Sequence, residues 1–369
     1  MPAKQIPRRA LLAAGVGVGT AGLLALVGPH PVLQASGRTG DATLLTRVEP
    51  YLKGLNRVSV ALVDGDSTRF AGMGADERTP FGIGSVSKTF CGAVLMDMVA
   101  KGEVSLDTTV GELTDALGSD VAGVALRELA SHTSGLPNFT ATMTTTMNLN
   151  LGLLHAEGAH GDCSDTVADV LSQRLEGRGT FSYSTAGIAL LAHLLAERAS
   201  TTYEALLTER ILVPYSLAHT SLPVTPDGLP PRWAKGLLGG RPAEPWTLNG
   251  LAPGGGMWST GRDLAQWMRL TMAGLQPGSA GLEPVAPAPI LPWMPDAQIA
   301  ITWMRATTVA GEDLIFHNGL TGSHHAYVGY CPRTGRGVAY LVNSAPTGPQ
   351  LLTLQGDLVT ALLDEEQQP

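Results

Sequence analysis

Cysteine, lysine and aromatic residues are scarce in this chain of 369 residues, and charged residues make up only 15% of it. The formal net charge is −8, the wrong sign for a protein that binds nucleic acid through a basic patch. The sequence has no zinc-finger spacing, no glycine-rich phosphate loop ending in Lys-Ser or Lys-Thr, and no Gly-x-Ser-x-Gly elbow. We therefore expect neither a nucleic-acid partner nor a nucleotide-phosphate site nor an α/β-hydrolase.

The three cysteines allow at most one internal disulfide. Cys91 lies in an apolar helical run and is expected to be a buried small hydrophobe, whereas Cys163 and Cys331 could form a pair. His324 and His325 lie close to Cys331, but neighbouring residues on a strand point to opposite faces, so they cannot readily bind one ion. We expect no metal and no cofactor.

The N-terminal 35 residues have the layout of an export signal. Lys4, Arg8 and Arg9 precede an uncharged stretch over 10–27, and a small-residue cleavage site ends at Ala35. The arginine pair resembles a twin-arginine signal. An uncleaved membrane anchor is the alternative, because the apolar run is close to the roughly 20 residues that span a bilayer. Either way we expect an extracytoplasmic protein, and the chain without this segment has a net charge of −11.

Residues 36–369 are expected to form one catalytic domain. Two strand-like segments flank Asp64-Gly65-Asp66 and predict a β-hairpin, and an apolar helix is predicted from near Ser85 to Lys101-Gly102. A helical subdomain is predicted over about 105–250, and a loop over 277–295. The predicted helices of this subdomain are Val167–Leu175 and Ala186–Ala199. The later predicted elements are the strands Ile299–Met304, Leu314–His317, His325–Tyr330 and Gly337–Val342 and a closing helix, Leu351–Leu363.

This order of elements predicts an α/β (α+β) fold. Strands near both chain ends form one antiparallel sheet flanked by helices, and an all-α subdomain is inserted between them.

The segment Ser85-Val-Ser-Lys88 places a serine and a lysine one helical turn apart, on one face. A serine hydroxyl is a poor nucleophile until a base takes its proton. A lysine is such a base when burial keeps it neutral. The motif alone is weak, since the alternative is a surface lysine in the first turn of a helix.

Two further segments strengthen the interpretation of Ser85 and Lys88 as a catalytic pair. Tyr183 lies among small polar residues just ahead of an apolar helix, and His317-Asn-Gly319 ends a strand-like segment where glycine lets a ligand approach the backbone. The order Ser-x-x-Lys, Tyr-x-polar, His-x-Gly is the layout of penicillin-recognising serine hydrolases.

The chain thus resembles the serine β-lactamase-like family, which includes class C β-lactamases, serine D-Ala-D-Ala carboxypeptidases and related esterases. The resemblance covers nearly everything from residue 45 to 365. The segment His-Thr-Ser-Gly-Leu-Pro is highly specific to the family. The matching segments are Gly84–Thr89, Lys101–Asp107, Leu126–Pro137 and Gly254–Asp263.

The resemblance implies a role for each residue. Ser85 becomes acylated, Lys88 accepts or relays its proton, and Tyr183 passes that proton to the leaving group and later activates the deacylating water. His317 stands where many β-lactamases have lysine and holds the tyrosine network and the substrate. The backbone N–H groups of Ser85 and Leu320 form the oxyanion hole, and His132 is structural.

Two departures from the family concern the substrate. Thr185 replaces the usual asparagine of Tyr-Ser-Asn and offers one donor where an amide offers two. Asn318 and Leu320 flank Gly319 where β-lactamases and carboxypeptidases commonly have hydroxyl residues that bind a substrate carboxylate. We therefore expect uncharged short-chain esters to be turned over at least as well as D-Ala-D-Ala peptides.

Two other functions remain open at this point. A non-catalytic member would bind penicillin or cell-wall peptide as a sensor, and an acyltransferase would pass the acyl group of the same acyl-enzyme to an amine.

Overall fold

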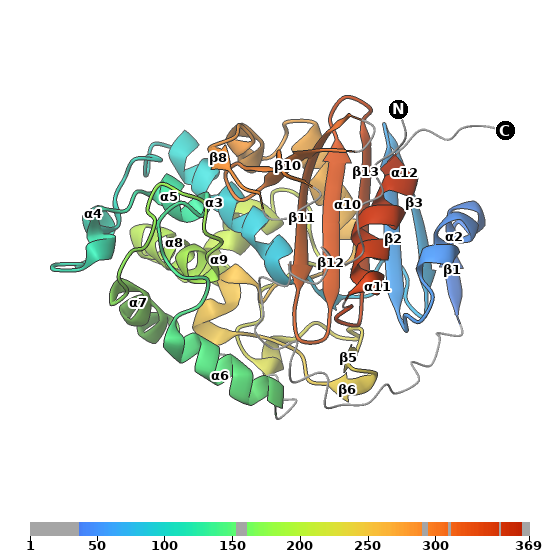
Figure 1. Cartoon of the computed structure of the whole chain (residues 1–369), viewed down its shortest axis with the longest axis horizontal. Helices are drawn as coiled ribbons and strands as arrows, with labels where there is room; N and C mark the ends of the chain where they lie inside the picture. Colours follow the sequence, from blue (N-terminus) through green and yellow to red (C-terminus); the bar gives the residue numbers. More distant parts are fainter. Residues whose placement is uncertain (1–36, 153–160, 290–293, 309–310, 347, 364–369) are drawn as a thin grey trace.

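The computed structural model describes residues 37–152, 161–289, 294–308, 311–346 and 348–363, so the expected export segment lies outside it. Its main feature is a nine-stranded antiparallel sheet in the order β1-β3-β2-β13-β12-β11-β10-β9-β8 (Figure 1). The strands are β1 Arg38–Gly40, β2 Val58–Asp64, β3 Ser67–Met73, β8 Ala286–Pro287, β9 Gln298–Ile299, β10 Met304–Thr307, β11 Asp313–Leu320, β12 His325–Cys331 and β13 Arg336–Val342.

The sheet joins the two ends of the chain. In β2 and β13, Val58 pairs with Val342 and Asp64 with Arg336. The hairpin β2–β3 turns at the Asp64-Gly65-Asp66 segment, where Gly65 has a positive φ of 57°. These pairings confirm the prediction that one antiparallel sheet is built from both chain ends.

Helices cover both faces of the sheet. Successive side chains of a strand point to opposite faces, so neighbouring residues of one strand pack against different helices. Val60 and Leu62 pack with α2 (Ala42–Val48) and the C-terminal helices, whereas Ala61 and Val63 pack in the core shared with α3 (Ser87–Ala100) and α10 (Gly261–Met272). The predicted closing helix is three consecutive pieces, α11 Pro349–Leu352, the π-helix η9 Thr353–Leu358 and α12 Val359–Leu363.

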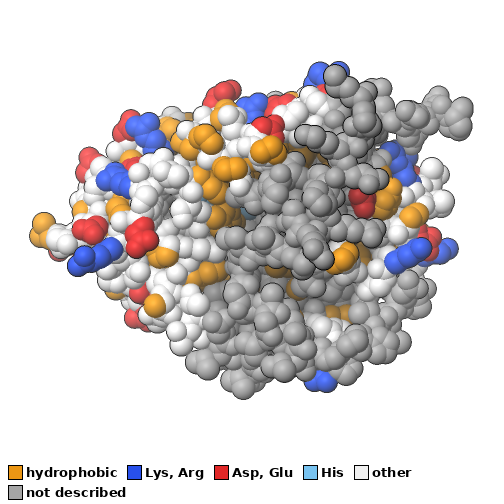
Figure 2. All heavy atoms as spheres, viewed as in Figure 1, with side chains coloured by type: hydrophobic (Ala, Val, Ile, Leu, Met, Phe, Trp, Pro, Cys, Tyr) orange, Lys and Arg blue, Asp and Glu red, His pale blue; other side chains and the backbone are white. Residues whose placement is uncertain are grey.

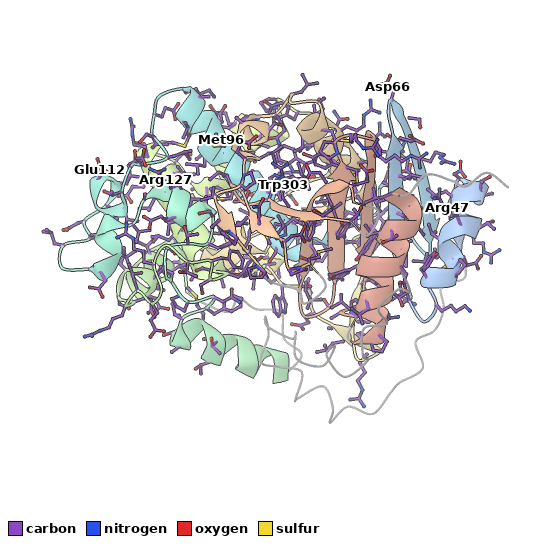
Figure 3. The ribbon with its side chains drawn as sticks, turned by 45° about the horizontal axis from the view of Figure 1, so that its top comes forward. Arg47, Asp66, Met96, Glu112, Arg127 and Trp303 are labelled. Atoms are coloured by element: carbon purple, nitrogen blue, oxygen red, sulfur yellow. The ribbon has the colours of Figure 1, made fainter. Side chains whose placement is uncertain are left out.

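The inserted part is mainly helical and packs against α3 and the sheet. Figure 3 shows Met96 of α3 and Trp303 between this part and the sheet, and both are buried. Its helices are α4 Val110–Leu113, α5 Leu126–Ala130, α6 Ala141–Gly152, α7 Cys163–Leu171, α8 Thr185–Arg198 and α9 Tyr203–Leu207. A small hairpin of β5 (Gly236–Leu238) and β6 (Arg241–Ala243) also lies within 105–250, and the sequence pattern did not predict it.

The structure corrects several element boundaries. The predicted strand Ile299–Met304 is interrupted, because Thr302 takes a left-handed φ of 62° and its hydroxyl donates to the Ile301 carbonyl. The helix predicted over Val167–Leu175 is α7, which begins four residues earlier because the Asp162 side chain caps it. The expected loop 277–295 contains the 3-10 turn η8 (Pro277–Gly281) and β8 in its described part.

The possible Cys163–Cys331 disulfide is also wrong. Cys163 is exposed at the start of α7, whereas Cys331 is buried at the end of β12. Cys91 is completely buried in α3, as expected.

On the face drawn in Figure 2, Lys and Arg side chains lie beside Asp and Glu side chains around the helical end, rather than in one basic patch. Within the described segments, no helix is both long and apolar enough to cross a membrane.

Candidate active site

The candidate nucleophile lies at the entrance to the central helix. β4 (Phe81–Gly82) leads through the 3-10 turn η3 (Gly84–Val86) into α3, and Ser85 is the middle residue of that turn. Ser85 is half-buried, whereas every other residue from Phe81 to Phe90 is buried. Its hydroxyl is therefore the accessible group in an otherwise enclosed segment.

Lys88 lies one turn further on and is completely buried. Its Nζ is 3.0 Å from Ser85 Oγ, 3.3 Å from Thr185 Oγ1 and 2.5 Å from the Gly254 carbonyl oxygen. All three partners are neutral, so none of them supplies a negative charge to offset the desolvation of an ammonium ion. Burial lowers the pKa of Lys88 to about 7. A large fraction of Lys88 is therefore a neutral amine at physiological pH, with a lone pair next to the serine hydroxyl.

Tyr183 approaches the same hydroxyl from the segment before α8. Its hydroxyl forms a hydrogen bond with the Ser85 side chain, and burial raises its pKa well above the usual value. Lys88 Nζ lies 5.0 Å from the centre of the Tyr183 ring. Tyr183 therefore keeps its proton at neutral pH and is suited to donating a hydrogen bond.

His132 packs behind Tyr183. The two rings are 4.4 Å apart, and His132 Nδ1 accepts the backbone N–H of Ser184 at 3.1 Å. Burial lowers the pKa of His132 well below its usual value, so the ring is neutral. This contact fixes the backbone next to Tyr183, in agreement with the structural role expected for His132.

His317 lies on β11 with its ring 6.5 Å from the Tyr183 ring. Its Nδ1 is 2.7 Å from the carbonyl oxygen of Asn318 and therefore carries the proton of that hydrogen bond. Its Nε2 is buried and has no partner among the described residues, so it presents a lone pair. Burial, with a smaller contribution from Lys88, lowers the pKa of His317 to about 3. His317 thus offers a neutral acceptor where a lysine would offer a cation.

The backbone of β11 lies directly against the turn that carries Ser85. A Cβ atom on Gly319 would be 1.9 Å from the Ile83 carbonyl oxygen and 2.7 Å from Ser85 N, and one on Gly84 would be 2.6 Å from Leu320 N. Only glycine fits at these positions. The approach brings the amide nitrogens of Ser85 and Leu320 into one neighbourhood, as an oxyanion hole requires.

The other residues predicted to contact the substrate are Leu320, Asn318 and Thr185. Leu320 leaves 39% of its surface exposed next to its amide, and Asn318 is half-buried. Thr185 begins α8 and is buried beside Lys88. The Lys88 side chain therefore joins Ser85 and Thr185. Tyr183 and the backbone of Gly319 and Leu320 lie next to the Ser85 turn, and the His317 ring lies beside Tyr183. The catalytic and substrate-binding roles of these residues stay predictions.

Two groups at the site were not predicted from the sequence. The Gly254 carbonyl is the shortest contact of Lys88, and Asn138 Oδ1 accepts the Thr185 hydroxyl at 2.9 Å. The available signal was their position, because Gly254 opens a family-like segment and Asn138 directly follows His-Thr-Ser-Gly-Leu-Pro. Within the described residues no group of three or more His, Cys, Asp or Glu side chains is placed to hold a metal ion.

Comparisons with known proteins agree on one family. The human beta-lactamase-like 1 protein is 29% identical over 65% of this chain, and the match spans only 50% of the human protein. Penicillin-binding protein 4 of Amycolatopsis lactamdurans is 25% identical over 76% of this chain and 77% of its own length.

The fold also matches solved structures. A D-stereospecific amidohydrolase from Streptomyces sp. has 19% identity and a TM-score of 0.72, over 84% of this chain and 97% of its own. A class C beta-lactamase from Rhodobacter sphaeroides has 18% identity and the same TM-score, over 88% and 100%. The sequence profile of the Beta-lactamase family matches residues 46–359. Because this match covers most of the chain, the protein belongs to the beta-lactamase family, whose members are generally serine hydrolases.

Proposed function

We propose that this protein is an exported serine hydrolase that forms an acyl-enzyme on Ser85 and acts on D-Ala-D-Ala-type peptides or on small esters and amides. The observation that carries the proposal is the position of Lys88. It is buried, has a pKa lowered to about 7 and lies 3.0 Å from Ser85 Oγ, and the Tyr183 hydroxyl contacts the same oxygen.

Acylation follows from this geometry. Neutral Lys88 takes the proton of Ser85 as Oγ attacks the substrate carbonyl carbon. The negative charge on the carbonyl oxygen is stabilised by the N–H groups of Ser85 and Leu320. Tyr183 donates its proton to the leaving group as the bond to that group breaks, and the proton held by Lys88 replaces it.

Deacylation uses the same groups in reverse. Water attacks the acyl carbonyl, gives its proton to the Lys88–Tyr183 pair and releases the acid. The Ser85 oxygen then recovers a proton.

The walls of the site favour uncharged substrates. Leu320 gains by covering alkyl groups, at roughly 0.8 kcal/mol per methylene. His317 is neutral, so a substrate carboxylate would lack charge-assisted hydrogen bonds worth about 1.5–3 kcal/mol each. Arg305, a possible cationic partner, is engaged with Asp313 at 2.7 Å. We propose that short-chain esters are turned over at least as well as D-Ala-D-Ala peptides and that penicillins acylate slowly.

A substrate panel tests this proposal. D-Ala-D-Ala peptide, nitrocefin and p-nitrophenyl butyrate are compared on the full chain, with fluorophosphonate labelling of Ser85 as a parallel measurement. Efficient hydrolysis of nitrocefin or peptide with negligible esterase activity would contradict the ester preference. Labelling without turnover of any substrate would favour a binding protein that senses penicillin or cell-wall peptide. Product formed only when an amine acceptor is added would favour an acyltransferase.

We further propose that residues 1–35 direct export, by the charge and apolar pattern described above. Mass spectrometry of the protein from the extracytoplasmic fraction tests this. A mature N-terminus near residue 36 is expected, and an intact chain in the membrane fraction would indicate an anchor.

A further inference from the structure

We infer that Asn138 is a substrate-specificity residue: its side-chain NH₂ donates a hydrogen bond to the acylamino carbonyl of a bound substrate, in place of the amide that Thr185 lacks. This inference rests on the proposed function and deepens it. It concerns substrates that carry an N-acyl group beside the reacting carbonyl.

Thr185 has no proton left to donate to a substrate. Its hydroxyl accepts from Lys88 Nζ at 3.3 Å and donates to Asn138 Oδ1 at 2.9 Å. A threonine hydroxyl has a single proton. An asparagine at 185 could accept from Lys88 with its oxygen and donate to substrate with its nitrogen, and Thr185 performs only the first of these tasks.

The orientation of the Asn138 amide is fixed by its hydrogen bonds. Oδ1 accepts both the Thr185 hydroxyl and the Thr185 backbone N–H, the latter at 3.1 Å. Two donors facing one atom require that atom to be the oxygen. The Asn138 backbone carbonyl also accepts the N–H groups of Thr185 and Ala186, so the residue is held against the start of α8 from two sides.

The NH₂ group of Asn138 is available to a substrate. Asn138 is half-buried, and its nitrogen has no hydrogen-bond partner within the part of the chain that the structure describes. This nitrogen is not one of the buried polar atoms without a partner, so it is accessible to solvent. Asn138 therefore presents two N–H donors, two hydrogen bonds away from Lys88.

Together, Thr185 and Asn138 divide one task between them. Thr185 holds the lysine, and Asn138 supplies the amide donor from a different loop. A peptide or an N-acylamino ester can use that donor, whereas a simple alkyl ester cannot.

The test compares two p-nitrophenyl esters that share one leaving group. One is the ester of N-acetyl-D-alanine, and the other is its carbon isostere, in which the amide is replaced by methylenes. Asn138→Asp keeps an oxygen for the Thr185 donors and removes the N–H donors. We expect kcat/KM for the acylamino ester to fall about tenfold relative to the isostere, which corresponds to one lost hydrogen bond of about 1.4 kcal/mol. Gln298→Glu, the same change at an exposed position on β9, should leave the ratio unchanged.

A second variant protects the test against a folding defect. Asn138→Ala combined with Thr185→Asn returns the amide to position 185 and should restore most of the substrate ratio that Asn138→Ala alone loses. An equal fall for both esters, or no rescue, would show that Asn138 only supports α8 and would overturn the inference while leaving the proposed function intact. Failure of the wild-type protein to label at Ser85 would instead contradict the proposed function.

Discussion

In the proposed mechanism Lys88 determines the pH range of activity, because only its neutral form can take the Ser85 proton. Its pKa of about 7 predicts that kcat/KM for an uncharged ester rises with pH and levels off above about pH 8. His317, with a pKa of about 3, adds no further step in this range. Rates measured from pH 5 to 9 on p-nitrophenyl butyrate should show this single acid limb. A flat profile would contradict a proton-relay role for Lys88.

Lys88 is also expected to lower the stability of the fold. Between pH 7 and 10 the unfolded chain holds the Lys88 proton and the folded chain does not, so wild-type stability from this group rises with pH. Lys88→Met should therefore be inactive but more stable than the wild type near pH 7. Its advantage should shrink by up to about 1.4 kcal/mol per pH unit toward pH 10.

Urea unfolding of the two proteins at several pH values measures this difference. The raised tyrosine pKa values are common to both proteins and cancel. A difference that stays constant from pH 7 to 10 would show that Lys88 is charged in the folded protein.

Ser85→Ala tests the nucleophile itself. We expect complete loss of fluorophosphonate labelling and turnover, with a change in stability of only about 1 kcal/mol, since the hydroxyl lies in a helix-initiating turn. Circular dichroism and thermal unfolding check the fold. Persistent turnover would mean that another group is acylated.

Some residues of the site were predictable from the sequence and others were not. Ser85, Lys88 and Tyr183 were predictable because their spacing and neighbours form recognisable motifs. Asn138 was not, since its contact with Thr185 spans 47 positions and depends on how two loops meet. The Gly254 carbonyl was not predictable either, because any residue has a backbone carbonyl and only the fold decides which one faces Lys88.

Among the elements, β11 and the turn η3 depend most closely on each other. In Gly319→Ala the new methyl group would overlap the Ile83 carbonyl and the Ser85 amide, which are backbone atoms that cannot rotate away. The strand must shift, and the Leu320 amide shifts with it. Loss of one oxyanion donor typically costs 10²- to 10³-fold in kcat, and we expect a fall of about this size.

Gly356→Ala is the matched control. Gly356 lies in η9 of the C-terminal helices, and a Cβ atom there would meet no atom within 4 Å. Its activity should equal that of the wild type, with an equal or higher melting temperature because alanine favours helix. Wild-type activity in Gly319→Ala would show that the strand does not need this close approach.

Elements were predictable where local patterns decide them. The Asp-Gly-Asp turn between two strand-like segments predicted the β2–β3 hairpin, and the continuous apolar run predicted α3. The break between β9 and β10 was not predictable, because Thr302 is a β-branched residue in a left-handed conformation that local preference disfavours. The hairpin of β5 and β6 is three residues per strand, too short to show alternation.

At the scale of the whole molecule, the fold class was predictable because strand patterns occur at both ends of the chain around a helical middle. The strand order was not, since nothing local indicates that β13 lies beside β2. The family resemblance supplied what periodicity could not, namely that Ser85, Tyr183 and His317 meet at one place.

That strand order has a consequence for how the protein is made. On the ribosome, β2 is complete after residue 64, yet its neighbour β13 ends only at Val342. The Gly319 strand that completes the Ser85 site is likewise synthesised more than two hundred residues after the serine. Such distant pairings are slow to form. If the proposed function holds, a partly synthesised chain carries its serine and lysine without the Leu320 amide, and we expect it to be inactive until nearly all of it has been translated.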